Sequence, residues 1–328
     1  MQKLRIRVAN SKSGAFFEIA NGWVNAFKKA GHDANLKTNN DAWDNPDLCI
    51  GCSGWKQSIP PKSKRGNTKV AIHVNPWCDD RIQVGSGPLI NESKEAIDWV
   101  KAQQPDVVFG YGLQQDMGVY WRGWNLHGFK TVGMPNAADL TRYSPTGHDK
   151  NHVCDVAWVG GYWDYKAVNL DKYLIPVVKQ YHTTWYGWSG PPLPCYKGKC
   201  DDAIMPLLFS NARICPTVVE PHTTQYGIDM PERIFKVAAC GGLVISDPVA
   251  GLNRYFKNVL VANNPSEYVK LCDKWIKASD EERREQAAKL RQEVINGHTY
   301  YHRVRDLLRS MGFQAQAMEF DSIIASLT

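Results

Sequence analysis

The sequence has no run of about 18 apolar residues, the length that a membrane-spanning helix needs. Its opening stretch, MQKLRIRVAN, has a short alternating pattern and no apolar core of the signal-peptide type. The nine cysteines follow no regular spacing, and an odd number is typical of reduced thiols rather than of a disulfide framework. These absences argue against a membrane-spanning or disulfide-rich secreted protein, and we expect a cytoplasmic one.

The excess of one charge sign is also small, since the formal net charge is only +6 over 328 residues. No internal repeat or low-complexity tract is visible. Hydrophobic residues make up 43% and charged residues 22%, which is typical of a globular protein with well-packed cores. The length suggests two domains of ordinary size. The mild positive charge permits an anionic partner without requiring one.

Apolar strand patterns alternate with helical ones along the first part of the chain. Residues 4–9 alternate as a strand, and residues 16–27 repeat apolar side chains at helical spacing before Gly31. Further strands are predicted near 48–51, 69–74, 106–112 and 130–135. Strands that alternate with helices predict a parallel sheet covered on both faces. We place a first domain at residues 1–140.

A second series of the same kind follows the polar, Pro- and Gly-punctuated segment 135–152. VCDVAWVGGYW opens it as a strand that ends in two glycines. Strands are then predicted near 182–188, 213–219, 243–247 and 259–263. Helices are predicted near 172–181, 201–212, 231–240 and 265–278, and a further surface helix begins at the charged DEERREQ segment. We expect a second domain at 141–310 and a C-terminal helix, 311–328, that packs back on the first. The fold class is α/β, with two Rossmann-like doubly wound domains facing across a cleft where ligands bind.

The stretch MPERIFKVAACGGLVISDPVAGL, residues 230–252, carries the most information. Pro231 is favoured in a first helical turn, and Gly241 suits a left-handed C-cap. The N-terminus of such a helix also offers free N–H groups and a partial positive charge to an anion. The residues alone leave two interpretations open, a capped core helix and an anion-binding helix.

Residues 130–310 resemble GT-B glycosyltransferases, in particular the CgeB-type "glycosyl transferases group 1". That family pairs an R-x-F-E-x-x-A-C-G helix with a D-x-x-x-G-L segment and a terminal H-T-Y-x-H-R. The corresponding stretches of this sequence are, in the same order, ERIFKVAACG, DPVAGL and HTYYHR. DVAWVGGYWDYK is similar to the family's D-V-x-F-V-G strand and glycine loop. MPNAADLTRYSP resembles the linker that ends the first domain in many GT-B enzymes.

The resemblance implies a nucleotide-diphosphate sugar, with a UDP-sugar favoured, held mainly by the second domain and an acceptor held mainly by the first. The helix from Pro231 would point its N-terminus at the donor diphosphate, and Arg233 would share the negative charge. Gly160 and Gly161 would form a loop beside the phosphates, with Lys166 as a second cation. An ordinary turn is the alternative for paired glycines.

The chain departs from the family at one donor contact. Lys236 stands where family members usually carry a glutamate, and Ile228 stands eight residues before it, so no glutamate pair exists here. We therefore move the expected ribose contact to Glu232. Whether Lys236 itself contacts the donor stays open.

A catalytic base is expected after the strand near 69–74, in the stretch AIHVNPWCDD. The candidates are Asp80, Asp79 and His73, with the aspartates ahead because the weak family similarity falls on them. A base within hydrogen-bond reach would activate an acceptor hydroxyl. Solvated turn aspartates are the alternative interpretation.

Metal sites are not favoured. His298 and His302 have metal-pair spacing, but no carboxylate motif supports them, so packing and capping are preferred. The motifs CIGC (49–52) and CYKGKC (195–200) could together offer four thiolates to zinc, yet they fall in different predicted domains. No D-x-D motif follows a convincing strand end. We expect no essential metal and no cofactor besides the sugar-nucleotide donor substrate.

We expect a glycosyltransferase that moves a hexose to a hydroxyl acceptor. A sugar-nucleotide-binding protein or an epimerase on the same plan is the alternative class. The family resemblance implies a surface glycan or protein as acceptor. The basic loop PPKSKRGNTK (60–69) and the aromatic stretch VYWRGWNLHG (119–128) favour nucleic acid instead. The chain also resembles phage enzymes that glycosylate hydroxymethylpyrimidines, so a 5-hydroxymethylpyrimidine in DNA, in host cytoplasm, is a further hypothesis. The stereochemical outcome and the oligomeric state stay open.

Overall fold

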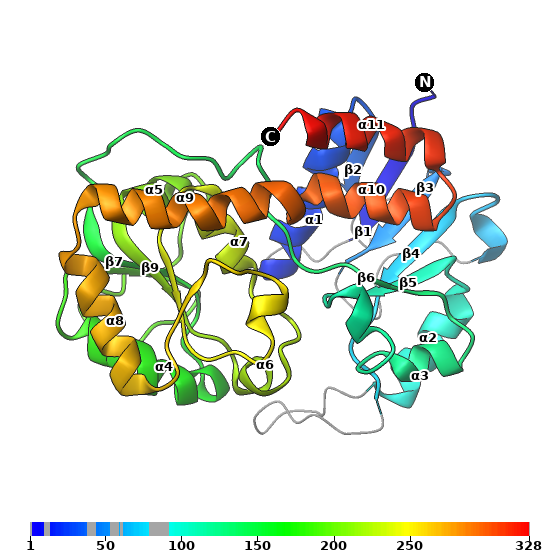
Figure 1. Cartoon of the computed structure of the whole chain (residues 1–328). Helices are drawn as coiled ribbons and strands as arrows, with labels where there is room; N and C mark the ends of the chain where they lie inside the picture. Colours follow the sequence, from blue (N-terminus) through cyan, green and yellow to red (C-terminus); the bar gives the residue numbers. More distant parts are fainter. Residues whose placement is uncertain are drawn as a thin grey trace. The chain divides into compact units, whose positions relative to one another are not determined.

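The computed structural model describes residues 2–9, 14–37, 44–52, 59, 62–78 and 92–327. The chain divides into two compact units (Figure 1). The second unit is continuous from Leu140 to Gly297. The first combines the described residues up to Asp139 with those from His298 onward, so its C-terminal helices come from the far end of the sequence.

The first unit is built on a parallel six-stranded sheet in the order β2-β1-β3-β4-β5-β6. Its strands are β1 (Arg5–Ala9), β2 (Asp33–Lys37), β3 (Leu48–Gly51), β4 (Lys69–His73), β5 (Val107–Gly110) and β6 (Thr131–Gly133). The central strand β3, with the sequence LCIG, is buried at every position. A fully apolar strand of this kind is expected where helices cover both faces of a parallel sheet.

Helices of the first unit pack on this sheet through apolar stripes. They are α1 (Ala15–Lys29), α2 (Lys94–Gln103), α3 (Arg122–Leu126), α10 (Tyr300–Ser310) and α11 (Gln314–Ala325), with short 3₁₀ turns η1 (Lys62–Lys64) and η2 (Gln114–Asp116). In α1, Ile19, Trp23 and Phe27 recur every four residues and are buried. Gly22 lets α10 approach α1, because a Cβ there would lie 2.2 Å from the Tyr300 ring.

The second unit is built on a parallel five-stranded sheet in the order β11-β10-β9-β7-β8. Its strands are β7 (Cys154–Val159), β8 (Thr183–Tyr186), β9 (Ala212–Thr217), β10 (Val244–Ser246) and β11 (Leu260–Val261). Its helices are α4 (Asp164–Val178), α5 (Ile204–Asn211), α6 (Pro221–Tyr226), α7 (Glu232–Ala239), α8 (Pro265–Lys277) and α9 (Asp280–Gly297), with the 3₁₀ turn η3 (Leu252–Arg254). Trp158, Trp185 and Tyr268 are completely buried in its core.

The expected fold class is confirmed: each unit is a parallel α/β sheet covered by helices. The predicted helix at 231–240 is α7, with Pro231 as its N-cap and Gly241 at φ 74° beyond its end. The elements β2, α3 and α6 and the short 3₁₀ turns were not predicted. The predicted second domain extends to residue 310, whereas α10 belongs to the first unit. Among the described residues, no helix combines the length and apolarity needed to cross a membrane.

Two stretches of the first unit, one before residue 140 and one after residue 297, are tied to each other. Ala138 donates its N–H to the His298 carbonyl over 2.8 Å and accepts one from Tyr300 over 3.1 Å. Arg303 Nε donates to the Pro135 carbonyl over 2.6 Å, and its Nη2 lies 3.0 Å from His298 Nδ1. His298 is therefore engaged in packing where the sequence spacing also allowed a metal pair.

Candidate functional site

Several strand ends of the second unit meet at one edge of its sheet. Because β7, β9 and β10 run parallel, their carboxyl ends lie side by side. Gly160 and Gly161 follow β7, Glu220 lies three residues after β9, and Asp247 directly follows β10. This edge gathers the residues that carry the chemistry of the second unit.

Arg233, in the first turn of α7, is fixed against the end of β7. Its Nε donates to the Val159 carbonyl over 2.8 Å, and its guanidinium carbon lies 3.7 Å from the centroid of the Trp158 ring. This cation–π stacking orients the charge. A Cβ on Gly160 would lie 2.2 Å from Arg233 Nη2, so a side chain there would displace the guanidinium from this position. Burial, partly offset by Glu220, lowers the pKa of Arg233 to about 10.

Lys166, on α4, points at this edge but has a carboxylate partner. Its Nζ lies 2.8 Å from Glu220 Oε1, and only 6% of the residue is exposed. Burial opposes the charged form of Glu220, but Lys166 outweighs it and holds the pKa of that carboxyl below its usual value. Sequence reasoning found Lys166 and missed Glu220, because 54 residues separate the two along the chain.

The second glycine of the loop faces an aromatic ring. A Cβ on Gly161 would lie 2.3 Å from Trp188 Nε1, and Trp188, two residues after β8, is 65% exposed. Gly187 is equally confined, since a Cβ there would lie 2.4 Å from the Gly160 carbonyl oxygen. The glycines predicted as a phosphate-side loop thus touch Arg233 on one side and Trp188 on the other.

Two carboxyl groups near this edge hold protons unusually well. Asp247 is completely buried, and burial raises its pKa to about 8 although the Val219 N–H hydrogen-bonds to it. Asp229 has a side chain that is 36% exposed, and partial burial together with the charge of Glu220 raises its pKa as well. His222, whose Nε2 lies 3.9 Å from Asp229 Oδ2, stacks 5.9 Å from the Tyr165 ring. Perturbed groups that cluster in this way are typical of functional sites.

Glu232 and Lys236 form an ion pair along one face of α7. Lys236 Nζ lies 2.8 Å from Glu232 Oε2, and the side chains are only 10% and 11% exposed. Lys236 also lies over the Tyr143 ring, 5.1 Å from its centroid. Lys236 therefore fixes the Glu232 carboxylate, for which the sequence predicts a ribose contact.

His73, at the end of β4 in the first unit, is a buried neutral imidazole. It stacks on Tyr111 with ring centroids 4.0 Å apart and lies against Phe109. Burial lowers its pKa to about 3, which makes it a weak base in this environment. Asp79 and Asp80, the other two expected bases, lie outside the described residues.

The aromatic stretch in the first unit has a structural role. Trp121 and Trp124 are completely buried, and their Nε1 atoms each donate 2.9 Å hydrogen bonds, to Val74 and Asn75 respectively. They hold the segment that follows β4. The basic loop precedes β4, whereas these two tryptophans bind the segment that follows β4, so they fill the core and do not lie beside the basic charges.

The thiols and imidazoles offer no metal site in the part of the chain that the structure describes. No group of three or more His, Cys, Asp or Glu residues there could hold an ion. All nine cysteines are free, and those of CIGC are buried with raised thiol pKa values because of desolvation. His302 lies 2.8 Å from Thr299 Oγ1 at the start of α10.

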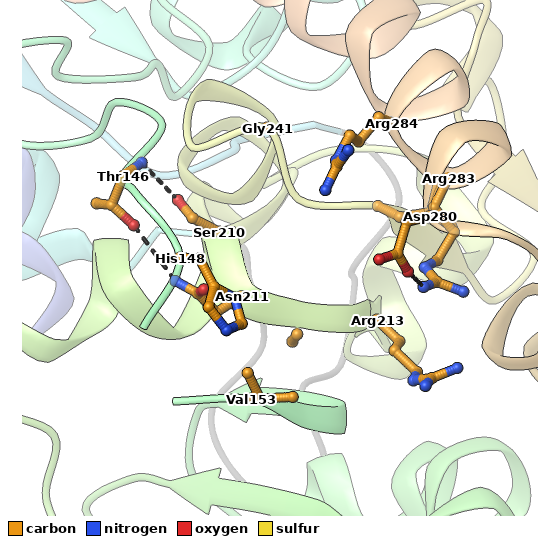
Figure 2. A pocket seen from close by; sticks show the side chains of 12 residues that line it. Thr146, His148, Val153, Ser210, Asn211, Arg213, Gly241, Asp280, Arg283 and Arg284 are labelled. Carbon is orange, nitrogen blue, oxygen red and sulfur yellow. Dashed lines mark hydrogen bonds and ion pairs between the residues drawn. The ribbon is translucent and has the colours of Figure 1, made fainter. Parts of the chain in front are cut away.

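A pocket of about 280 Å³ lies at the opposite, amino-terminal edge of the second sheet (Figure 2). Arg213 lines it and donates to the Ile276 carbonyl over 2.8 Å. Arg283 donates to the Ala278 carbonyl and pairs with Asp280. These arginines cap the end of α8. None of the expected site residues lines this pocket.

Comparison with known proteins supports the resemblance. Residues 165–309 match a protein family described as "Glycosyl transferase-like". This match, which covers most of the second unit and residues 298–309 of the first, confirms the expected enzyme class, a glycosyltransferase. No curated protein is significantly similar in sequence.

Solved GT-B structures share the fold at low sequence identity. HepE from Anabaena, solved with UDP-glucose, has 11% identity and a TM-score of 0.58 over 94% of this chain and 100% of its own. BGT from phage T4, solved with UDP and Mn²⁺, has 12% identity and a TM-score of 0.57 over 96% and 99%. An alpha-glucosyltransferase solved with UDP-glucose and DNA containing an abasic site has 11% identity and a TM-score of 0.62 over 95% and 100%.

Replacement of Asp247 should change how stability depends on pH. The folded-state pKa of about 8 lies above the ordinary value of 3.8, so between these values the folded state keeps a proton that the unfolded state has lost. The stability contributed by this group is therefore fully present below about pH 4 and is lost as the pH rises toward 8, by up to about 1.4 kcal/mol per pH unit. Asp247→Asn should flatten this decline.

Urea unfolding of the wild type and Asp247→Asn at pH 5 and pH 7.5 measures this difference. Asp164→Asn, which removes an exposed carboxylate at the start of α4, serves as the control and should follow the wild type. The same pH dependence in Asp247→Asn and the wild type would contradict the raised pKa.

Reversal of the ion pair on α7 separates its structural and binding roles. Lys236→Glu places two mostly buried carboxylates side by side and should cost on the order of 3 kcal/mol. The double variant Glu232→Lys with Lys236→Glu restores an ion pair and should recover much of that loss, as thermal unfolding will show. A Lys236→Glu variant as stable as the wild type would mean that the pair contributes little.

Proposed function

We propose that the protein transfers a hexose from a UDP-sugar to a hydroxyl acceptor, with the donor on the second unit and the acceptor on the first. The observation that carries this proposal is the placement of Arg233 at the N-terminus of α7, pressed against the loop that follows β7. A helix N-terminus and a guanidinium that converge on a glycine loop suit a diphosphate.

The donor would lie along the carboxyl edge of the second sheet. Arg233 and the first free N–H groups of α7 would hold the diphosphate, while Gly160 and Gly161 let it approach the backbone closely. Lys166 would add positive charge from its ion pair with Glu220. Glu232, oriented by Lys236, would accept hydrogen bonds from the ribose hydroxyls.

In the transfer, the acceptor oxygen forms a bond to the anomeric carbon while the bond from that carbon to the phosphate oxygen breaks. Negative charge then develops on the diphosphate, where Arg233 would stabilise it. A base would take the proton of the acceptor hydroxyl. We retain Asp80 and Asp79 for this role ahead of His73, because a pKa of about 3 makes the imidazole a poor proton acceptor.

We further propose a 5-hydroxymethylpyrimidine in DNA as the acceptor, which would place the enzyme in host cytoplasm if a phage encodes it. The support is the similarity in fold to an alpha-glucosyltransferase solved with DNA, together with the positive net charge. The target base would have to leave the duplex stack, which costs a few kcal/mol that phosphate contacts offset. A surface glycan or protein is the second candidate acceptor.

Arg233→Ala should weaken donor binding and slow transfer. One charge-assisted hydrogen bond contributes about 1.5–3 kcal/mol, so kcat/KM for the donor should fall roughly 10- to 150-fold. Arg291→Ala is the matched control, because Arg291 donates to the Ala239 carbonyl at the opposite end of α7. Steady-state kinetics and UDP binding by calorimetry measure both variants.

Folding must be checked in this comparison, since Arg233 also stacks on Trp158. Arg233→Lys keeps the charge but loses the planar fork, so it should fall between the wild type and Arg233→Ala. If folded Arg233→Ala had the same donor kinetics as the wild type, Arg233 would not contact the donor.

The acceptor is tested by offering radiolabelled UDP-glucose, and then other radiolabelled nucleotide sugars, with plain duplex DNA or with DNA that contains 5-hydroxymethylpyrimidines. Label should enter only the modified DNA, and transfer should fall steeply as salt rises. Release of UDP without acceptor and with glycan acceptors is followed in parallel. Absence of label in DNA with any UDP- or other nucleotide-sugar would exclude the DNA acceptor. UDP release with glycans alone would leave a transferase with a different acceptor, and donor conversion without transfer would indicate an epimerase.

A further inference from the structure

The basic segment of the first unit, residues 62–69, lies at the amino-terminal edge of its sheet. Lys62–Lys64 form η1, and β4 begins at Lys69 and ends at His73. Four residues of extended strand span about 13 Å, so this segment lies well away from the edge where β4 ends. The proposed chemistry therefore leaves this charge unexplained.

A cavity of about 690 Å³ opens beside this segment. The start of β1, the turn before β3, the basic segment and the turn between α10 and α11 contribute to its lining. Its charged lining residues are Arg5, Lys64, Arg65, Lys69 and Asp47. Cations outnumber acids in this wall, and the volume is within the range of small-molecule sites.

Arg65 places a fixed positive charge behind this wall. The residue is 1% exposed, and its Nη1 and Nη2 donate to the carbonyls of Gln103 and Gln104 at the end of α2 over 2.6 and 2.5 Å. Its hydrogen-bond acceptors are thus neutral. The nearby Asp106 carboxylate is engaged by Lys69 Nζ and the Val70 N–H, each at 2.8 Å. A buried charge without a carboxylate partner is costly, and an anion in the cavity would offset that cost.

The other cations are better exposed. Lys64 and Arg5 are both exposed, and neither forms an ion pair with a carboxylate among the described residues. Met311 and Phe313 supply an apolar wall with one aromatic ring. Cations beside an aromatic ring suit a phosphate joined to a flat base, since the base can stack while the phosphate meets the charges.

We propose that this cavity binds the phosphate ester of a nucleotide, either free or within a nucleic-acid strand. Lys64 and Arg5 would face the phosphate, Arg65 would add positive charge from behind the wall, and the Phe313 ring would stack on the base. This site lies on the first unit and at the sheet edge opposite to the end of β4, so it stands independently of the proposed transfer reaction.

The test measures binding to the full-length protein, without transfer, of three probes: inorganic phosphate, AMP and a 12-nucleotide single-stranded DNA. Lys64→Glu and Arg5→Ala should each weaken AMP and DNA binding at one site by about tenfold, as expected for loss of a charge-assisted contact. Lys289→Glu, on the exposed side of α9 in the second unit, is the matched control and should bind like the wild type. Arg233→Ala should leave this site unchanged.

Thermal unfolding verifies that both variants fold, and two separate positions keep the test valid if one variant does not. DNA that binds at least tenfold more tightly than AMP, with a salt dependence reduced in Lys64→Glu, would identify a strand as the ligand. Equal affinity for AMP and DNA would identify a free nucleotide. The proposal would be overturned if neither Lys64→Glu nor Arg5→Ala altered the binding of AMP and DNA. It would also be overturned if inorganic phosphate bound as tightly as AMP.

Discussion

A guanidinium stacked on an indole holds the carboxyl edge of the second unit together. Arg233 lies over Trp158 and hydrogen-bonds to the Val159 carbonyl, so the end of β7 and the start of α7 are fixed to each other. Because the arginine fills the space beside Gly160, a larger residue at the start of the loop after β7 would displace the guanidinium. The position of the loop, the orientation of the helix and the local charge all depend on this one contact.

The neighbouring charges follow from that contact. Arg233 brings a cation into a poorly solvated place, and Glu220 favours its charged form while pairing with Lys166. Burial raises the pKa of Asp247 to about 8, and the charge of Glu220 adds a smaller effect in the same direction, so Asp247 keeps its proton at neutral pH. Arg233 and Lys166 carry two positive charges at this edge, and Glu220 supplies one negative charge. The edge is therefore suited to an additional negative group.

The fold could be predicted from the sequence because parallel sheets leave a strong pattern of short apolar strands between amphipathic helices. The strand β2, with the sequence DANLK, escaped because it lies at the sheet edge and has few apolar residues to repeat. The glycine loop and Arg233 were found because each belongs to a contiguous motif. Glu220, Trp188 and Asp247 were missed because only the tertiary structure brings them to the same edge.

Tryptophan shows why the rest of the site resists prediction. Trp121 and Trp124 stand in a sequence of glycines and cations that suggests an exposed binding surface, yet both are completely buried. Trp188 lies in a similar setting and is exposed. These tryptophans have similar local sequences, and only their long-range packing decides which are buried in the core and which are exposed at the surface.

The discontinuity of the first unit has a consequence for biosynthesis. The second unit is complete once Gly297 has left the ribosome, whereas the first lacks α10 and α11 until residues 300–325 have also been made. Until then Trp23 is without Tyr300, and Phe27 is without Phe320. The unit encoded first is therefore the one whose core closes last, and a prematurely terminated chain would expose the apolar face of α1 to aggregation while its second unit is already folded.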